Sequence, residues 1–97
     1  MDEKWYITAS FEMIEEHREA AMAALKEMVE ATRKEAGCIS YILTQDRANP
    51  SKYMFLETWA NEAALQAHRV APHMKEFQKR MEGKRANRVV TMLQKVL

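Results

Sequence analysis

Residues 57–77 read ETWANEAALQAHRVAPHMKEF, and this stretch decides how the second half of the chain folds. Its first residues end an apolar strand, and Asn61 is a favoured residue for starting a helix. Pro72 suits the first turn of a following helix, where its missing N–H is not needed. The stretch therefore predicts a strand and then a helix broken in two, with His68 before the break and His73 after it.

The pattern on either side of this stretch predicts the rest of the topology. Apolar residues at helical spacing indicate a long first helix over residues 14–36, which Gly37 ends as a left-handed cap. Alternation of apolar and polar side chains indicates four strands. The predicted strands cover residues 5–11, 38–46, 52–59 and 88–97. We expect a single α+β domain over residues 1–97, with a ferredoxin-like β-α-β-β-α-β order and helices on one face of an antiparallel sheet.

The strands are apolar on both faces, which a sheet with one wet face would not be. In the second strand, the prediction places Ile39, Tyr41 and Leu43 on one face and Cys38 and Ile42 on the other. In the third, it places Tyr53, Phe55 and Trp59 opposite Met54 and Leu56. Helices can cover only one face, so we expect a second copy of the chain to cover the other as a homodimer.

Composition excludes several classes of partner. The 97 residues carry fifteen basic and fourteen acidic side chains, a formal net charge of +1, which gives no strong field for nucleic acid or an anionic membrane. The third strand lacks the glycine of the RNA-recognition pattern. No apolar run approaches the roughly 20 residues of a membrane span. With Cys38 as the only cysteine and no signal-peptide pattern, we expect a cytoplasmic protein in which Cys38 is packed in the core.

The histidines are the candidates for chemistry. His68 shares a helix face with Ala64 and Leu65, where both a packed histidine and a general base are consistent with the pattern. His73, just after Pro72, lies at a helix start that favours a neutral ring. The two histidines stand five apart across a proline, and no cysteine or carboxylate is evidently placed as a third ligand, so we expect no metal. The chain has two glycines and no phosphate-binding or dinucleotide motif, so no cofactor is predicted.

Several segments together resemble the antibiotic biosynthesis monooxygenase (ABM) family. They are EAGCISY at residues 35–41, QD at 45–46 before the Asn49-Pro50 turn, FLETW at 55–59, EAALQAH at 62–68 and PHM at 72–74. The resemblance implies a dimeric α/β barrel. It leaves the reaction open, because some members oxygenate quinols or polycyclic phenols with O2 and no metal or flavin, others degrade haem, and others process phosphorylated signalling sugars. Gln78 stands near the position of the haem branch's iron-ligating histidine, which argues against that branch.

The quinol branch implies a small aromatic substrate and O2, with a pocket between sheet and helices in which His68 or His73 removes a phenolic proton. Trp59 would shape the pocket, and Tyr41 or Ser40 would hydrogen-bond a substrate oxygen. The residues expected to contact substrate are Ser40, Tyr41, Trp59 and Phe77. Two alternatives remain: an isomerase or sugar-processing enzyme using the same base, with Arg69 or Arg88 holding a phosphate, and a dimeric binding module without catalysis.

Overall fold

The structure, a computed structural model, describes residues 3–97, so Met1 and Asp2 of the predicted domain lie outside the described residues. The helices and strands follow the predicted order, with the second helix in two pieces. They are β1 (Trp5–Met13), a 3-10 turn η1 (Glu15–His17), α1 (Arg18–Thr32), β2 (Cys38–Gln45), β3 (Lys52–Trp59), α2 (Glu62–Arg69), α3 (Pro72–Arg80) and β4 (Arg85–Leu93). None of the helices within residues 3–97 is long and apolar enough to cross a membrane.

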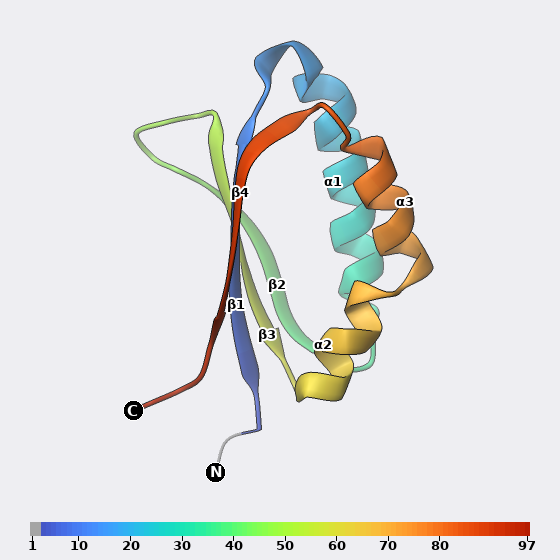
Figure 1. The fold of residues 1–97 in the computed structure, drawn as a ribbon, viewed down its shortest axis with the longest axis vertical. Coiled ribbons are helices and arrows are strands. Elements are labelled where there is room, and N and C mark those ends of the chain that lie inside the picture. The colour runs from blue at the N-terminus through green and yellow to red at the C-terminus, as the bar shows by residue number, and fades with distance from the viewer. Residues whose placement is uncertain (1–2) are drawn as a thin grey trace.

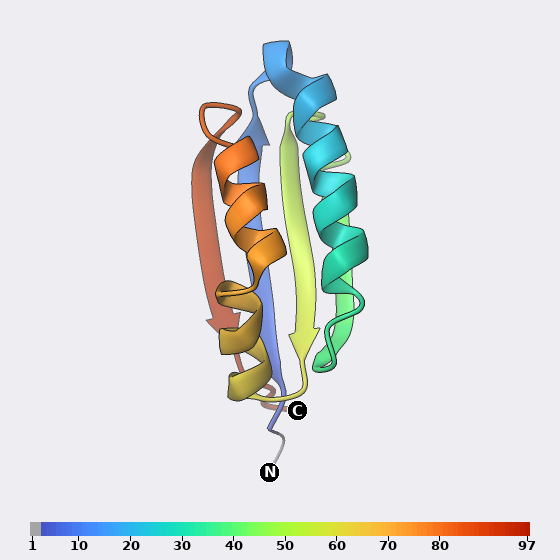
Figure 2. The same ribbon diagram turned by 90° about the vertical axis from the view of Figure 1, so that its right-hand side faces the viewer.

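The four strands form one antiparallel sheet in the order β2-β3-β1-β4. Figure 1 shows the sheet edge-on with all helices on one side of it, and Figure 2 shows α1 and α3 side by side in front of the strands. The predicted α+β, ferredoxin-like fold is confirmed. The alternation of β1 and β3 explains the layering, because every second side chain of a strand points to the same face.

The core lies between the sheet and the helices. Phe11 stacks on Tyr53 with ring centroids 5.4 Å apart, and Tyr41 packs against Phe55 at 5.2 Å. The helices contribute the predicted apolar stripes. These stripes include Ala21, Leu25 and Met28 of α1, Leu65 of α2, Phe77 of α3 and Met81 just after it. Trp59 is completely buried at the end of β3, beneath α2.

The predicted first helix is too long at both ends. The chain forms a short 3-10 turn before α1, and α1 ends at Thr32, so Glu35 lies in the turn that follows it. Gly37 does not have the left-handed conformation predicted for it, since Gly83 (φ 72°) is the glycine with positive φ among the described residues. The reason for a glycine at 37 is space: a Cβ there would lie 2.1 Å from the Cβ of Ala64.

The predicted faces of the second strand are corrected by an irregularity. The pairing of β2 with β3 shifts register between Cys38 and Ser40. An extra residue in a strand reverses the alternation beyond it. Cys38 therefore packs against the core with Tyr41, whereas Ile39 is 52% exposed.

The fourth strand begins and ends earlier than predicted. It starts at Arg85, soon after the turn at Gly83, so Val96 and Leu97 lie beyond it. The register between β1 and β4 shifts between Ser10 and Glu12, opposite Asn87, which has a φ of 53°. Bulges of this kind re-aim neighbouring side chains. Arg85 and Arg88 both lie on β4, and with this bulge between them both line the cavity described below.

Candidate active site

The short helix α2 holds His68 against the sheet. Asn61 caps the helix as predicted, because its Oδ1 accepts a hydrogen bond of 2.9 Å from the backbone N–H of Ala64. With the helix start fixed, Leu65 and His68 fall on the inward face, three residues apart. His68 is only 4% exposed, which confirms its predicted inward position.

One carboxylate oxygen joins the two histidines. Oε2 of Glu35 lies 2.7 Å from Nδ1 of His68 and 2.9 Å from Nε2 of His73. A carboxylate only accepts hydrogen bonds, so each of these ring nitrogens donates to it. His73 Nε2 also lies 3.3 Å from the Thr32 hydroxyl, which donates to the sulfur of Met28. The broken helix and the turn after α1 thus converge on Glu35.

The expectation that no carboxylate stands near both histidines was wrong. Glu35, His68 and His73 place three ligand-type atoms within 4.8 Å of one another, and these are the residues that could hold a metal ion. The two contacts with Glu35 have the length of ordinary hydrogen bonds. Among residues 3–97, no side-chain nitrogen or oxygen that is itself fully buried lacks a partner, and the ring nitrogens that face Glu35 are satisfied by it.

The environment of His68 favours the neutral ring. Burial lowers the pKa of His68, and although the hydrogen bond to Glu35 raises it, the lowering prevails. The contact with Glu35 is therefore a hydrogen bond from a neutral imidazole at pH 7. Because Nδ1 carries the proton, Nε2 is the unprotonated nitrogen, and it has no hydrogen-bond partner among the described residues. An imidazole in this state is a proton acceptor.

Aromatic rings surround His68. The ring of Trp59 lies 4.5 Å from that of His68 between centroids, and the ring of Tyr41 lies 5.6 Å away. The indole N–H of Trp59 donates to Oε1 of Glu57 at 2.9 Å, and the Tyr41 hydroxyl donates to Met28. Burial raises the pKa of Tyr41, so its hydroxyl stays protonated at neutral pH. Trp59 forms the wall behind His68.

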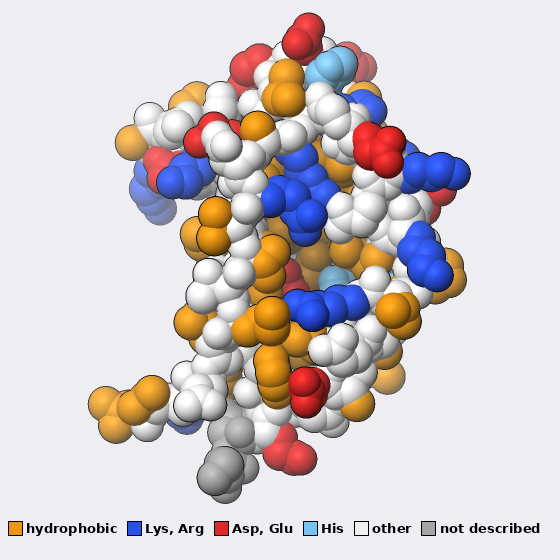
Figure 3. Space-filling view, viewed as in Figure 1, with side chains coloured by type: hydrophobic (Ala, Val, Ile, Leu, Met, Phe, Trp, Pro, Cys, Tyr) orange, Lys and Arg blue, Asp and Glu red, His pale blue; other side chains and the backbone are white. Residues whose placement is uncertain are grey.

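A cavity of about 620 Å³ opens beside His68, between β1, β3 and β4 on one side and α2 and α3 on the other. Its size is within the range of small-molecule sites. Figure 3 shows the opening as a hollow with hydrophobic side chains and a histidine inside and Lys or Arg at its rim. Of the predicted site residues, Tyr41, His68 and Phe77 line this cavity, together with Phe55 and Glu57.

The other three predicted site residues do not line this cavity. His73 is linked to it only through Glu35 and His68, and Trp59 lies behind His68. Ser40 lines a separate, smaller depression with Arg33, Cys38 and Ile42. Burial raises the pKa of the Cys38 thiol, which disfavours a reactive thiolate there. The roles of Ser40 and Trp59 in substrate contact stay predictions.

Sequence reasoning missed three residues of the site. Glu57 is an acid at an inward position of β3, and burial raises its pKa. The sequence signal that could have identified it is an acidic residue among the apolar residues of one strand face. Glu35 had no signal, because it was assigned to the end of a helix. Arg85 was missed because β4 was predicted to begin three residues later. Arg69 and Arg88, named without a location, both line the cavity.

Comparison with known proteins agrees with the fold. The family profile described as antibiotic biosynthesis monooxygenase matches residues 5–80. The uncharacterized protein sll1783 of Synechocystis is 30% identical over 76 residues, 78% of this chain and 52% of that protein, so the chain spans about half of that relative's length. The probable quinol monooxygenase YgiN of Escherichia coli is 31% identical over 75 residues, 69% of this chain and 72% of YgiN.

Solved structures extend the likeness to the whole fold. The crystal structure of PA3566 from Pseudomonas aeruginosa superposes with a TM-score of 0.90 and 29% identity, covering 100% of this chain and 98% of that one. The profile match takes in β1 through α3, and with them Glu35, His68 and His73. The chain belongs to the antibiotic biosynthesis monooxygenase family.

Proposed function

We propose that this protein is a monooxygenase that oxidises a quinol or polycyclic phenol with O2 and without a metal or flavin. The observation that carries the proposal is the hydrogen bond from His68 Nδ1 to Glu35, which leaves Nε2 as an acceptor beside an aromatic-walled cavity. The likeness to YgiN, a probable quinol monooxygenase, supports the choice of reaction.

His68 acts as the general base. A phenol has a pKa of about 10 and imidazole about 6.5, so the proton transfer is uphill by about 4–5 kcal/mol. Lowering the pKa of His68 widens this gap, and stabilisation of the phenolate within the cavity must offset it. Arg69, which lines the cavity and directly follows His68 in the chain, provides positive charge for this purpose. Glu35 stabilises the imidazolium that forms, because its carboxylate already accepts the Nδ1 proton.

The substrate itself supplies the electrons. The ring of the phenolate transfers one electron to O2, and recombination of the radical pair forms a carbon–oxygen bond. The imidazolium of His68 returns its proton to the distal oxygen, which gives a hydroperoxide. Loss of the proton from the same ring carbon then breaks the O–O bond and releases water. One oxygen atom ends in a ring carbonyl and the other in water, so the phenol loses four electrons and O2 gains four.

The remaining residues position rather than react. His73 shares the acceptor oxygen of Glu35 and so helps to hold that carboxylate in place, which makes it a positioning residue. Phe77 and Phe55 form apolar walls for an aromatic ring, and the ring of Tyr41 lines the cavity while its neutral hydroxyl donates to Met28.

The test is oxygen consumption with a panel of quinols and naphthols. We expect turnover by the wild type, a loss of about 10²–10⁴-fold in His68→Ala, and no change in His17→Ala, an exposed histidine outside the cavity. Dialysis against EDTA should leave the rate unchanged, because Glu35 and both histidines satisfy one another. A wild type that consumes no oxygen across the panel contradicts the reaction; an unimpaired His68→Ala contradicts only the base.

We also propose that the protein is a homodimer. Ile42, Leu56, Val89 and Leu93 lie on the sheet face opposite the helices, and each is 42% to 58% exposed. Figure 1 shows no helix on that side of the sheet. Exposed apolar side chains on three of the four strands of this face favour burial against a second copy.

A further inference from the structure

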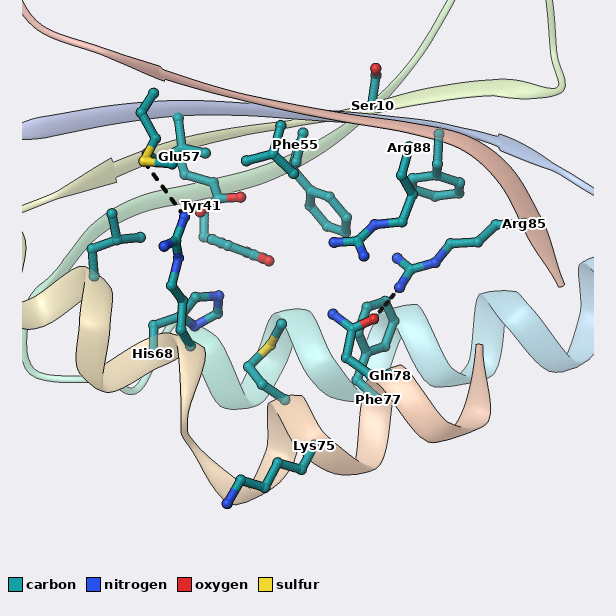
Figure 4. Close-up of a pocket in the computed structure, with 18 of the residues that line it drawn as sticks. Ser10, Tyr41, Phe55, Glu57, His68, Lys75, Phe77, Gln78, Arg85 and Arg88 are labelled. Atoms are coloured by element: carbon teal, nitrogen blue, oxygen red, sulfur yellow. Dashed lines mark hydrogen bonds between the residues drawn. The ribbon is translucent and has the colours of Figure 1, made fainter. Parts of the chain in front are cut away.

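The cavity has a chemically distinct second end. Figure 4 shows His68, Tyr41 and Glu57 at one end, and Arg85 and Arg88 with Gln78 and Phe77 at the other. The close-up also shows that Lys75 points away from the interior. A ligand spanning the cavity therefore meets the proton acceptor His68, with Glu57 and Arg69 near it, at one end and the two guanidinium groups of Arg85 and Arg88 at the other.

These guanidinium groups are not neutralised by protein carboxylates. Among residues 3–97, the arginines in ion pairs are Arg18 and Arg80, both elsewhere. Arg85 donates to the neutral side-chain carbonyl of Gln78, and its guanidinium lies 5.1 Å from the ring centroid of Phe77. Glu82 also lines the cavity but makes no ion pair with Arg85 or Arg88.

Leaving the two arginines in this arrangement has an electrostatic cost. Burial and the like charge of Arg88 lower the pKa of Arg85 to about 10, which still leaves it charged at neutral pH. A charge withdrawn from water is unfavourable unless an opposite charge pairs with it. An anionic group at this end would remove the repulsion between the two arginines and pair both of them.

We propose that Arg85 and Arg88 bind an oxyanion of the substrate, a carboxylate or phosphate attached to the aromatic ring at the end remote from the hydroxyl that faces His68. The guanidinium fork matches the oxygens of such groups in bidentate geometry. Phe55 lies between the two ends, Phe11 and Phe77 lie beside Arg85, and these three apolar rings suit a flat aromatic ligand. The inference rests on the proposed function only in taking this cavity as the substrate site.

The experiment measures binding of fluorescent naphthol probes under argon, so that no turnover is needed. The probes are 6-hydroxy-2-naphthoate, its neutral analogue 6-hydroxy-2-naphthamide, and 6-hydroxy-2-naphthyl phosphate. We expect the naphthoate to bind about tenfold or more tightly than the amide, with an affinity that falls as salt rises. Tighter binding of the phosphate than of the naphthoate identifies a phosphorylated substrate, and the reverse order identifies a carboxylated one.

Variants then test the residues. Arg88→Gln and the double variant Arg85→Gln/Arg88→Gln should lose the preference for the anionic probes while binding the amide within about twofold of wild type. Arg47→Gln, in the exposed loop between β2 and β3, removes the same charge away from the cavity and should keep the preference. Circular dichroism and thermal melting of each variant establish that it is folded.

The outcomes separate this inference from the proposed function. Three results would overturn the anion site. The wild type could bind acid and amide equally, or bind neither. The arginine variants could lose binding of both probes equally. If the enzyme oxidises neutral quinols and shows no preference for the acid probe, the monooxygenase is supported and the anion site is contradicted. Anion-selective binding that depends on Arg88, combined with no oxygen consumption, supports the anion site and contradicts the monooxygenase.

Discussion

At the scale of single residues, the shared oxygen of Glu35 determines which ring nitrogen of His68 carries the proton. Its hydrogen bond and its charge both raise the pKa of His68, against the stronger lowering by burial. The balance leaves a neutral base whose proton-accepting nitrogen is directed away from Glu35. His73 lies outside the cavity but still belongs to the site, because it donates to the same oxygen of Glu35.

A pH profile of kcat/KM tests this balance. Protonated His68 cannot accept a proton, so activity should fall as pH drops through a pKa below 6.5. Above that pKa His68 is neutral, and its titration should no longer change the activity. Glu35→Gln removes the charge that raises this pKa and leaves Nδ1 with a neutral acceptor, so the acid limb should move to still lower pH while the plateau rate decreases.

The matched control for Glu35→Gln is Glu30→Gln, an exposed carboxylate on α1. It should leave both the limb and the plateau unchanged. An acid limb that stays in place in Glu35→Gln, with wild-type plateau rate, would show that Glu35 does not act on the base.

At the scale of secondary-structure elements, the site depends on how closely α2 approaches the turn after α1. The backbone N–H of Ala60 donates to the carbonyl of Gly37 at 2.9 Å, and the Cβ of Ala64 occupies the space a side chain at 37 would need. This close approach brings Glu35 within hydrogen-bond distance of His68. A small residue at 37 is thus a condition for assembling the site.

Gly37→Ala should destabilise the protein by about 1–3 kcal/mol, because the added methyl would overlap with Ala64. Chemical denaturation measures the change. Adding Ala64→Gly to Gly37→Ala removes the overlapping methyl and should recover part of the loss despite the cost of a helical glycine. Additive effects of the two changes would contradict the steric explanation.

The cap of α2 gives a second prediction at this scale. Asn61→Ala removes the hydrogen bond to the N–H of Ala64 and should cost about 0.5–2 kcal/mol of unfolding free energy. Asn61→Asp keeps an acceptor at the helix start and should stay close to wild type. Equal losses in both variants would mean that the cap does not stabilise α2.

At the scale of the whole molecule, the uncovered sheet face sets the expected assembly. Leu56→Glu places a charge on a β3 side chain that is 42% exposed, and it should convert the dimer to monomers in light scattering at micromolar concentration. Val70→Glu, at a 65% exposed position between α2 and α3, is the matched control and should remain dimeric. A wild-type monomer at that concentration would contradict the assembly itself.

Local patterns in the sequence were sufficient for much of this fold. The alternation in β1 and β3, the cap at Asn61 and the start of α3 at Pro72 are all confirmed, because each depends on neighbours a few residues away. The same patterns placed His68 on an inward face. The predicted faces of β2 and the predicted start of β4 were wrong, because a bulge depends on how a strand pairs with its partner strand.

The sequence by itself determined the order of elements and the inward histidine, since hydrophobic periodicity and capping are encoded over short spans. Tertiary structure alone decided that Glu35 meets His68 and His73, and that Arg85 and Arg88 line the same cavity. Glu35 and His68 are 33 residues apart. No local pattern encodes that contact, because it arises only when the turn after α1 packs against α2.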